Sequence, residues 1–414
     1  MPETAQESPG RQRRSTGVAA RPLRICLVTP AYPPMVGGIA RYTWDLAQGL
    51  TGRGHDVVVL VAAGKRPESA ADGAGGPRVR WLVDTTPTAR LLRTVPGGTD
   101  LRRSLQVARE IRSLHAERPF DVVECASWRA LGAAHSLRKS APQLLRATTA
   151  IAQVPKESGG WTDRLRDLAG RRVLDASERV CLARSERVIA PTESHLQSLP
   201  PRIRSTGGVM PFGIPAPVGE PRRSGDTVLY VGRLSGRKGF DLFASAASLL
   251  LAEDASARIV IAGKDHIDDT GSMWEKHGEP LSRRYGERVA WRGEVSDAEL
   301  EELYWTSDVC AVPSRYESFG LVFLEANSHG LPVVAWNTAF GREVAGPGAR
   351  LVTPWDARAY ADALHDTLRS AAGAPLTGQG LRELTAERYG MERFVERTES
   401  LYREMAAAPA QRTE

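Results

Sequence analysis

Two glutamates flank a glycine and a run of apolar residues in YESFGLVFLEA, residues 316–326. Glu317 precedes the glycine, and Glu325 follows after seven intervening residues. Two carboxylates so placed can work as a general acid and base, can hold a sugar by hydrogen bonds, or can be a coincidence in a chain with many glutamates. The interval does not choose among these, because it also separates four other pairs: Glu178/Glu186, Glu279/Glu287, Glu294/Glu302 and Glu396/Glu404.

The residues around this pair predict a strand, a loop and a helix. VCAVPS, residues 309–314, is an apolar strand, and a helix is expected to begin near Gly320–Leu321. The first amides of such a helix are free at the exit of the strand, and Glu325 lies one turn in, on the face of Leu321. Both carboxylates are therefore predicted to reach one cleft. A glutamate near a helix start and a second on the surface remain the simpler alternative.

A second loop carries two cations, in VGRLSGRKG, residues 231–239. It is not a phosphate-binding P-loop, because its glycines are too close and Gly239 stands where Ser or Thr should follow the lysine. Arg233 offers a planar fork and Lys238 a point charge, and together with a helix start they form a sound diphosphate site. A solvated basic turn is the alternative.

The third loop is YPPMVGG, residues 32–38, which comes before a helical pattern that begins at Ile39. Gly37 and Gly38 allow the backbone to approach a ligand, and the helix start behind them favours anions. The motif is not GxGxxG, so a plain strand-to-helix turn is the alternative.

Motifs of other chemistries are missing from the sequence. It holds no Asp-x-Asp, no HExxH, no clustered histidines and no G-x-S-x-G elbow. We therefore expect no protein-held metal, no cofactor and no serine nucleophile.

The elements that must position these loops occur in two similar sets. Apolar strands at residues 23–30 and 226–234 each lead into a glycine loop and a helical pattern. Short apolar strands then alternate with helical stretches, which predicts α/β architecture with parallel sheets in two Rossmann-like domains. The Pro/Gly-rich stretch 207–221 is the expected linker. Ligands of such sheets bind beyond the carboxyl ends of the strands, where all three loops lie.

Length and composition agree with this division. A chain of 414 residues exceeds one ordinary core, and its 42% hydrophobic and 25% charged content is that of a globular protein. No apolar run is long enough to span a membrane, and four isolated cysteines suit a reducing cytosol, so we expect a cytoplasmic protein. The net charge of +6 suits an anionic small molecule, and no aromatic-basic motif indicates nucleic acid. Residues 1–21 are predicted to be a disordered basic tail.

Taken together, these motifs resemble glycosyltransferase family 4, retaining enzymes of the GT-B fold, over residues 22 to 405. The resemblance rests on YPPMVGGIARY, SERVIAPTE, VLYVGRLSGRKGFD, RIVIAGKD, VAWRGEVSDAELEELY and PSRYESFGLVFLEANSHGLPVVAW, in that order. It implies two Rossmann-like domains facing each other across a cleft. The acceptor domain would span residues 22–212, the donor domain 213–390, and a helix at 391–405 would pack back towards the first domain.

The resemblance also implies roles for individual residues. The donor would be a nucleotide-diphosphate sugar, with UDP or GDP favoured, and the acceptor a small molecule; no metal would be required. Glu317 matches a contact to the donor sugar and Glu325 a contact to the ribose hydroxyls. The implied catalytic residues are Arg233, Lys238 and Glu317. The implied donor-binding residues are Gly37, Gly38, Gly293, Val295, Phe319, Gly320, Leu321 and Glu325.

The chain departs from the family at Thr148, where the family usually has a histidine. Threonine does not titrate, so the enzyme does without that contact, or another group such as Glu124, His135 or Thr149 serves, or the chain is a weakened relative. Phe212 also replaces a small or polar residue and is expected to alter the hinge or the cleft wall. The acceptor-side candidates are Glu124, Trp128, Thr148 and Thr149, with Trp161, Arg164 and Arg166 as further aromatic and basic groups.

The expected function is therefore retaining transfer of a sugar to a small polar acceptor, as in natural-product or small-thiol glycosylation. Three alternatives stay open. The first is a peripheral membrane enzyme with a lipid acceptor, although membrane contact is not favoured. The second is a non-hydrolysing nucleotide-sugar epimerase, and the third is an inactive nucleotide-sugar-binding relative.

Overall fold

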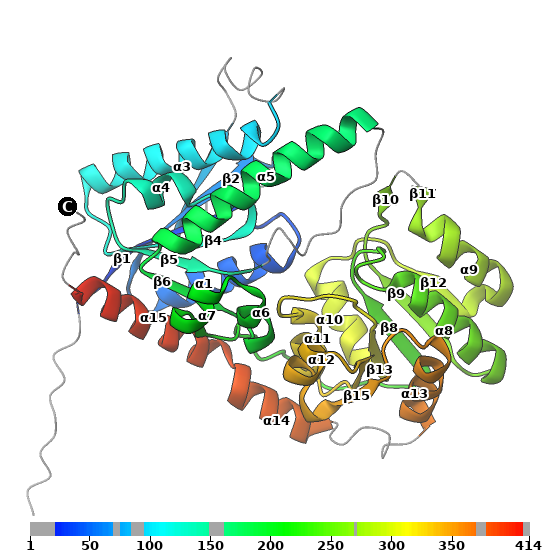
Figure 1. Ribbon diagram of the computed structural model, residues 1–414. Helices are drawn as coiled ribbons and strands as arrows, with labels where there is room; N and C mark the ends of the chain where they lie inside the picture. The colour runs from blue at the N-terminus through cyan, green and yellow to red at the C-terminus, as the bar shows by residue number, and fades with distance from the viewer. Residues whose placement is uncertain are drawn as a thin grey trace, which may run out of the picture.

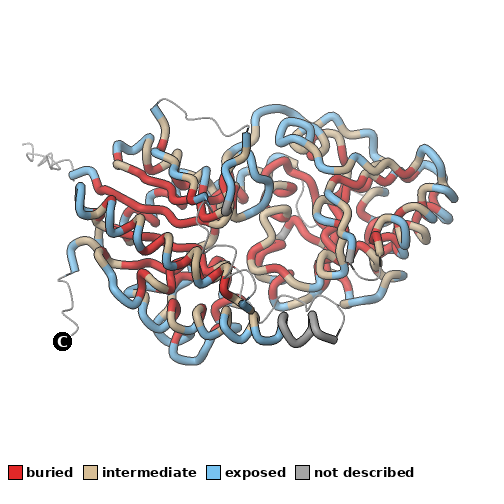
Figure 2. Tube along the Cα trace, turned by 90° about the horizontal axis from the view of Figure 1, so that it is seen from above, coloured by how far each residue is buried: buried red, intermediate tan, exposed pale blue. Residues whose placement is uncertain are grey.

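The computed structural model describes residues 21–68, 75–83, 95–148, 161–268, 271–369 and 378–408. Two α/β units lie side by side, each built on its own parallel sheet (Figure 1). The buried strands form the interior of both units and the exposed segments lie outside them (Figure 2). The prediction of two Rossmann-like α/β domains is confirmed.

The first sheet has seven strands in the order β3-β2-β1-β4-β5-β6-β7, all parallel. Its central strands are apolar on both faces because helices cover both sides, and β1 is buried at every position. The strands are β1 Arg24–Thr29, β2 Asp56–Gly64, β3 Arg78–Val83, β4 Val122–Ala126, β5 Gln143–Arg146, β6 Arg187–Ala190 and β7 Gly208–Val209. The helices are α1 Gly38–Gly52, α3 Gly98–Glu117, α4 Ala133–Leu137, α5 Trp161–Arg184, α6 Glu193–Ser198 and α7 Pro201–Thr206, with a short turn η1 at Trp128–Ala130.

The second sheet has six parallel strands in the order β12-β9-β8-β13-β14-β15. These strands are β8 Thr227–Val231, β9 Arg258–Ala262, β12 Val289–Trp291, β13 Val309–Val312, β14 Val333–Trp336 and β15 Ala349–Val352, beside a small hairpin of β10 Ile267–Asp268 and β11 Gly271–Ser272. The helices are α8 Phe240–Glu253, α9 Glu279–Tyr285, α10 Asp297–Thr306, α11 Leu321–Ser328, α12 Ala339–Val344, α13 Ala357–Arg369, α14 Gly378–Tyr389 and α15 Met391–Ala407, with short turns at Trp274–Gly278, Gly286–Arg288 and Gly346–Gly348.

The chain crosses between the sheets twice, and the two crossings are hydrogen-bonded to each other. The Ile214 amide donates to the Tyr389 carbonyl at 2.8 Å, and the Met391 amide donates to the Ile214 carbonyl at 3.1 Å. Helix α15 then runs along the first domain against α1 (Figure 1). Residues 1–20 of the predicted tail lie outside the described part of the chain, and Arg21 forms an ion pair with Asp121 at 2.6 Å.

Phe212 joins the two domains through aromatic contacts. Its ring stacks on Tyr42 of α1 with centroids 4.6 Å apart, and meets Phe319 edge-on at 5.1 Å and Phe394 of α15 at 6.1 Å. The side chain is buried, within an apolar cluster that includes residues of both sheets. Phe212 is therefore a buried aromatic contact at the junction of the two domains and does not line an open cleft.

The four cysteines, Cys26, Cys125, Cys181 and Cys310, are all buried free thiols. Burial raises the pKa of the Cys181 thiol to about 12, which keeps it protonated at physiological pH. Among the described residues, no helix is both long enough and apolar enough to cross a bilayer.

Candidate active site

A glycine sets the start of the helix behind the two glutamates. Strand β13 ends at Val312, and residues 313–320, which we call the Glu317 loop, lead into α11 at Leu321, as the sequence predicted. Gly320 is the N-cap in the left-handed region, with φ 70°. A Cβ atom there would lie 2.8 Å from Cζ of Phe340, so both conformation and space require glycine. The first amides of α11 are consequently free to meet a ligand beyond β13.

Glu317 is a buried carboxylate held by cations. Its Oε1 accepts hydrogen bonds from Nζ of Lys238 and from Oγ of Ser314, the latter at 2.9 Å. Its Oε2 lies 3.4 Å from Nη1 of Arg237. Burial by itself raises the pKa of Glu317, but Lys238 and Arg237 outweigh it and hold the pKa below its ordinary value. Glu317 is therefore ionised at neutral pH, which does not suit a general acid.

Two of these partners, Arg237 and Ser314, are not among the residues predicted for the site. Arg237 stands next to Lys238 in SGRKG, and Ser314 ends the strand motif, so both were visible as polar residues beside the predicted site. Lys238 and Glu317 were assigned to different parts of the donor, whereas the structure joins them directly.

Residues 232–239, which carry Lys238 between β8 and α8, are held directly against the Glu317 loop. Gly239 has φ 70°, and a Cβ atom there would lie 2.0 Å from the Pro313 carbonyl oxygen, so only glycine allows this approach. The Arg315 guanidinium donates to both carboxylate oxygens of Asp241 at 2.7 Å, which ties the Glu317 loop to the first turn of α8. Two loops that are far apart in sequence thus form one rigid edge.

Arg233 lies exposed at the end of β8, five residues before Lys238. Among the described residues, no hydrogen bond or ion pair involves its guanidinium; only its backbone carbonyl has a partner, the Tyr230 hydroxyl at 3.2 Å. The Lys238 side chain passes close to Gly232, since a Cβ atom on Gly232 would lie 3.6 Å from Cδ of Lys238. The structure therefore leaves Arg233 available to an anionic ligand beside Lys238.

Glu325 lies one turn into α11 and is half-buried. Its Oε2 accepts a hydrogen bond from the Tyr304 hydroxyl at 2.8 Å. Burial raises the pKa of Glu325 above its ordinary value, although the Tyr304 bond and the charge of Arg41 act against that shift. The Tyr304 contact was not predicted, because nothing in the spacing of the two residues indicates it.

The first domain meets this edge through its glycine loop. Gly37 is the N-cap of α1, and Gly37 and Gly38 are both exposed. A Cβ atom on Gly38 would lie 3.4 Å from Cδ1 of Leu321, so the start of α1 faces the start of α11. An ion pair of 3.3 Å between Arg41 and Asp297 also crosses between the domains. Two helix starts therefore converge on one place.

The other predicted donor residues lie on the same edge of the second sheet. Phe319 is buried against Phe212, inside the Glu317 loop. Gly293 and Val295 follow β12, and the Gly293 carbonyl accepts from the Gly263 amide at 2.7 Å. Because β12 is the outer strand of the sheet and β13 lies near its middle, these two residues lie along the edge from Glu317 rather than beside it.

On the acceptor side, Thr148 follows β5 and is buried. Its amide donates to Oγ of Ser127 at 3.0 Å. Ser127 comes directly after β4 and precedes the half-buried Trp128, the first residue of η1. Thr149 lies outside the described residues. Neutral hydroxyls therefore occupy the ends of β4 and β5.

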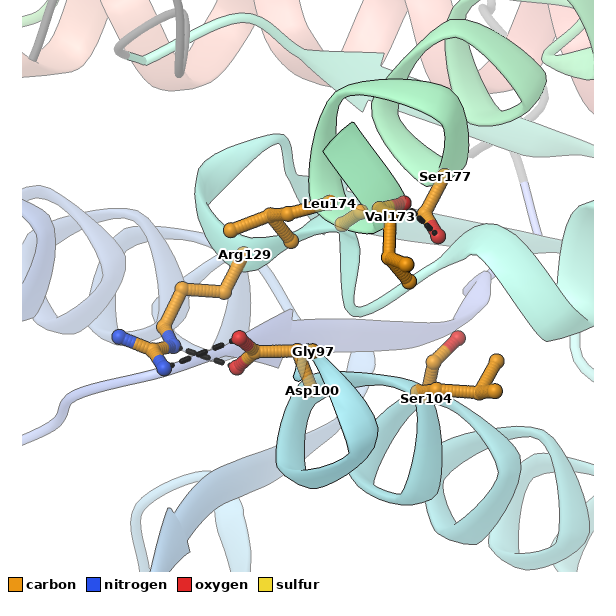
Figure 3. A pocket seen from close by; sticks show the side chains of 9 residues that line it. Gly97, Asp100, Ser104, Arg129, Val173, Leu174 and Ser177 are labelled. Carbon is orange, nitrogen blue, oxygen red and sulfur yellow. Dashed lines mark hydrogen bonds and ion pairs between the residues drawn. The ribbon is translucent and has the colours of Figure 1, made fainter. Parts of the chain in front are cut away.

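Arg129 is turned away from these hydroxyls. It has φ 60° and pairs with Asp100 at the start of α3 through contacts of 2.6 and 3.0 Å. Figure 3 shows this pair, with Val173 and Leu174 of α5 nearby. Trp161, Arg164 and Arg166 lie in the first turns of α5, and their side chains are outside the description.

Two acceptor-side candidates have internal partners instead. Both oxygens of Glu124 are bound by Arg146, at 2.7 and 2.9 Å, and Oε2 also accepts from the Tyr402 hydroxyl at 2.7 Å. His135 is fully buried with Nδ1 2.7 Å from Oε1 of Gln143, and burial lowers its pKa. The predicted acceptor-side role of Glu124 and His135 does not fit this burial, since their polar groups already serve the core.

The arrangement as a whole can stabilise negative charge. Arg233, Lys238 and the first amides of α11 lie at the carboxyl edge of β8 and β13, where they could bind an anionic group. Within the described residues, no group of three or more His, Cys, Asp and Glu side chains could hold a metal ion.

Two family models match the chain, one in each domain. The model "Glycosyl transferase 4-like domain" covers residues 37–202, and "Glycosyl transferases group 1" covers residues 225–370. The two matches follow each other in the order of the two sheets.

Characterised relatives match over most of their length. The D-inositol 3-phosphate glycosyltransferase of Kineococcus radiotolerans is 27% identical over 94% of this chain and 96% of its own. The GDP-mannose-dependent alpha-(1-6)-phosphatidylinositol monomannoside mannosyltransferase of Mycobacterium tuberculosis is 29% identical over 76% of this chain and 80% of its own.

Solved structures share the fold. Sucrose-phosphate synthase of Thermosynechococcus elongatus superposes with a TM-score of 0.71 at 22% identity, covering 94% of this chain and 100% of that one. Anabaena HepE, solved with UDP and glucose, gives 0.66 at 15% identity, covering 92% of this chain and 100% of that one. At such identities the likeness carries the fold alone.

Proposed function

Because the chain belongs to glycosyltransferase family 4, retaining nucleotide-sugar-dependent enzymes of the GT-B fold, we propose that it transfers a hexose from a UDP- or GDP-sugar to a small polar acceptor. HepE is solved with UDP-glucose, and the mycobacterial relative is named for GDP-mannose, so both donors have a precedent among similar proteins. The proposal for this chain rests on one observation: the Arg233 guanidinium, which has no partner among the described residues, lies in the same loop as Lys238 and near a helix start.

The reaction needs charge stabilisation at the leaving group. As the glycosidic bond breaks, the diphosphate gains negative charge, and preorganised cations and amides lower the barrier where that charge appears. We assign this role to Arg233, Lys238 and the amides at Gly320 and Leu321. Glu317, ionised beside Lys238, would contact the donor sugar and keep the lysine in place. Contact between the two domains would limit water at the site.

The acceptor is proposed from the ends of β4 and β5 in the first domain. Ser127 and Thr148 follow these strands; both are buried, and the Thr148 amide donates to Oγ of Ser127. Neither side chain can act as a base, so we propose a small polar acceptor that does not need a protein base at this position. An acceptor of higher intrinsic nucleophilicity, such as a thiol, would need less help still.

The nucleotide preference is the first thing to measure. A ligand stabilises the folded protein by RT ln(1 + [L]/Kd), about 2.7 kcal/mol at 100 times Kd. We expect one of UDP, GDP, ADP and dTDP to raise the melting temperature clearly above the others, and its monophosphate to raise it less. If none of the four, with or without an attached sugar, shifts the melting temperature, the nucleotide-sugar assignment is wrong.

Glu325 gives this site an expected pH dependence. Ribose hydroxyls can donate only to accepting oxygens, so the carboxylate form of Glu325 should bind the donor better than the acid form. Since burial places the pKa of Glu325 above its ordinary value, the charged form is lost at a higher pH than for an exposed glutamate. Affinity for the nucleotide sugar should therefore fall as the pH drops through that raised pKa.

The Glu325→Gln variant isolates this contribution. Loss of hydrogen bonds to a charged acceptor should weaken donor affinity by about 10- to 100-fold at neutral pH. The ratio of wild-type to variant affinity, measured by calorimetry from pH 5 to 8, should shrink towards low pH; the ratio cancels ionisation of the nucleotide. A ratio that stays constant over this range would rule out Glu325 as the titrating contact.

A further inference from the structure

Contacts from the first domain hold the Glu317 loop on both sides of the glutamate. Oγ1 of Thr192, the N-cap of α6, donates to the Ser318 carbonyl at 3.0 Å. Nδ1 of His195, one turn further on, lies 3.2 Å from the Tyr316 hydroxyl. Tyr316 and Ser318 are the immediate neighbours of Glu317 in sequence. The loop that belongs to the second domain is therefore hydrogen-bonded to the first domain directly before and directly after its functional residue.

A third contact fixes α6 itself to the second domain. The Glu343 carboxylate, on α12, accepts from the amides of Glu193 and Ser194, the latter at 2.8 Å. Helices α6 and α12 lie side by side in Figure 1. A carboxylate at free helix amides is a charge-assisted arrangement, stronger than a neutral hydrogen bond. The start of α6 is thus anchored where it meets the Glu317 loop.

The two first-domain side chains that hold the loop are buried, whereas their partners Tyr316 and Ser318 are half-buried. Thr192 and His195 are only 2% and 3% exposed. Burial lowers the pKa of His195 to about 4, so its imidazole is neutral at physiological pH and the bond to Tyr316 joins two neutral groups. Among the described residues, Nε2 of His195 has no hydrogen-bond partner, so the ring's side-chain hydrogen bond is the one to Tyr316. Buried hydrogen bonds of this kind favour one geometry because the alternative is an unsatisfied polar group.

On its other side the loop is held by the second domain. Lys238 and Ser314 bind the Glu317 carboxylate, and Nη1 of Arg237 donates to the Tyr316 carbonyl at 3.2 Å. The two sets of contacts meet at residues 316–318. Release of either set would free the backbone that orients Glu317 and leads to the amides of Gly320 and Leu321.

We propose that Thr192, His195 and Tyr316 form a positioning clamp, through which α6 of the first domain holds the Glu317 loop in its donor-binding shape before the donor arrives. This deepens the proposed function and rests on it for its meaning in transfer. A preorganised loop lowers the ordering cost of binding. In this proposal the three clamp residues are positioning residues, which act on the donor site through the loop.

Hydrogen–deuterium exchange of the amides of residues 314–320, in the full-length protein without ligand, tests the clamp. Tyr316→Phe removes the hydroxyl that contacts His195 and should speed exchange in the loop about three- to tenfold, the effect of one net hydrogen bond. Thr192→Val removes the bond to the Ser318 carbonyl and also the cap that Oγ1 gives the His195 amide at 3.1 Å, so it should speed exchange at least as much. The double variant should speed it further. Thr192→Ser, which keeps the hydroxyl, should exchange like the wild type.

The control is Tyr285→Phe, since the Tyr285 hydroxyl donates to the Ser248 carbonyl at 2.8 Å wholly inside the second domain. It should leave the loop unchanged. Unchanged loop exchange in both single variants and the double variant would overturn the clamp. So would acceleration that extends equally through β8 and β13, because that would be general destabilisation.

A second readout links the clamp to the donor. Saturation with the nucleoside diphosphate that stabilises the wild type should erase the exchange difference, and the KM for the donor should rise more than kcat falls. A fall in kcat at unchanged KM would contradict preorganisation. If the wild type binds no nucleoside diphosphate, the proposed function fails while the exchange result still decides the clamp.

Discussion

Replacement of Lys238 by methionine should slow sugar transfer by a factor on the order of 10²–10³, the usual cost of removing one preorganised donor to a developing charge. Methionine keeps the length and apolar stem of the lysine but removes the charge. The same change takes from Glu317 its closest cation. Because Arg237 and Ser314 remain, we expect a loss of stability of about 2 kcal/mol. Single-turnover transfer rates and urea unfolding measure the two effects separately.

Two further variants distinguish the roles of Lys238. Arg237→Met removes the other cation beside the same carboxylate, at 3.4 Å, and should slow transfer less than about tenfold. The double variant Lys238→Met/Glu317→Gln removes both members of the pair and should recover stability but not transfer. Recovery of transfer in the double variant would mean that Lys238 serves only to neutralise Glu317, and the diphosphate assignment would be wrong.

Glu124→Gln should cost about 3–5 kcal/mol of stability, the effect of breaking a buried ion pair. Arg146 is fully buried and donates to both Glu124 oxygens, so a neutral partner leaves its charge uncompensated in the core. Tyr402 of α15 also donates to Glu124, so the loss should loosen the contact of that helix with the first domain. Urea unfolding followed by circular dichroism measures the change.

The comparison of single and double variants tests whether the pair is structural. Arg146→Met should be similarly destabilising, and Glu124→Gln/Arg146→Met less destabilising than the sum of the two. At temperatures where Glu124→Gln is folded, transfer should stay within a few-fold of the wild type. A Glu124→Gln protein of wild-type stability that has lost transfer would restore Glu124 as an acceptor contact.

The architecture was predictable because it depends on local patterns. Continuous apolar strands such as residues 23–30, each followed by glycine and a helical pattern, are typical of parallel sheets buried on both faces. The start of α11 was predictable for the same reason, since Gly320 supplies the left-handed residue that such a helix start uses. Both signals lie within a few neighbouring residues.

The partners within the site were not predictable, because they depend on distant segments. Nothing near Glu317 in sequence indicates that Lys238 pairs with it, or that Tyr304 donates to Glu325. Glu124 is a second example, in which a predicted substrate contact is instead part of a buried ion pair. A glutamate after an apolar strand is compatible with a substrate contact and with a buried ion pair, and only the positions of Arg146 and Tyr402 decide between them.

The resemblance to the family implies a histidine at the position of Thr148. In the structure the Thr148 amide donates to the hydroxyl oxygen of Ser127. Phe212 connects the two domains, since it packs against Tyr42 of the first domain and against Phe319 of the Glu317 loop. The first domain is thus joined to the Glu317 loop by aromatic packing.

We propose that Arg233 and Lys238 hold the diphosphate of the donor, and calorimetry of nucleotide binding can test this assignment. Wild-type protein should bind the preferred nucleoside diphosphate at least about tenfold more tightly than its monophosphate. Arg233→Ala, which removes a guanidinium without a described protein partner, should weaken diphosphate binding by about 10- to 100-fold with little change in monophosphate binding or stability. Equal binding of diphosphate and monophosphate by the wild type, or wild-type diphosphate affinity in Arg233→Ala, would show that these cations do not hold the diphosphate.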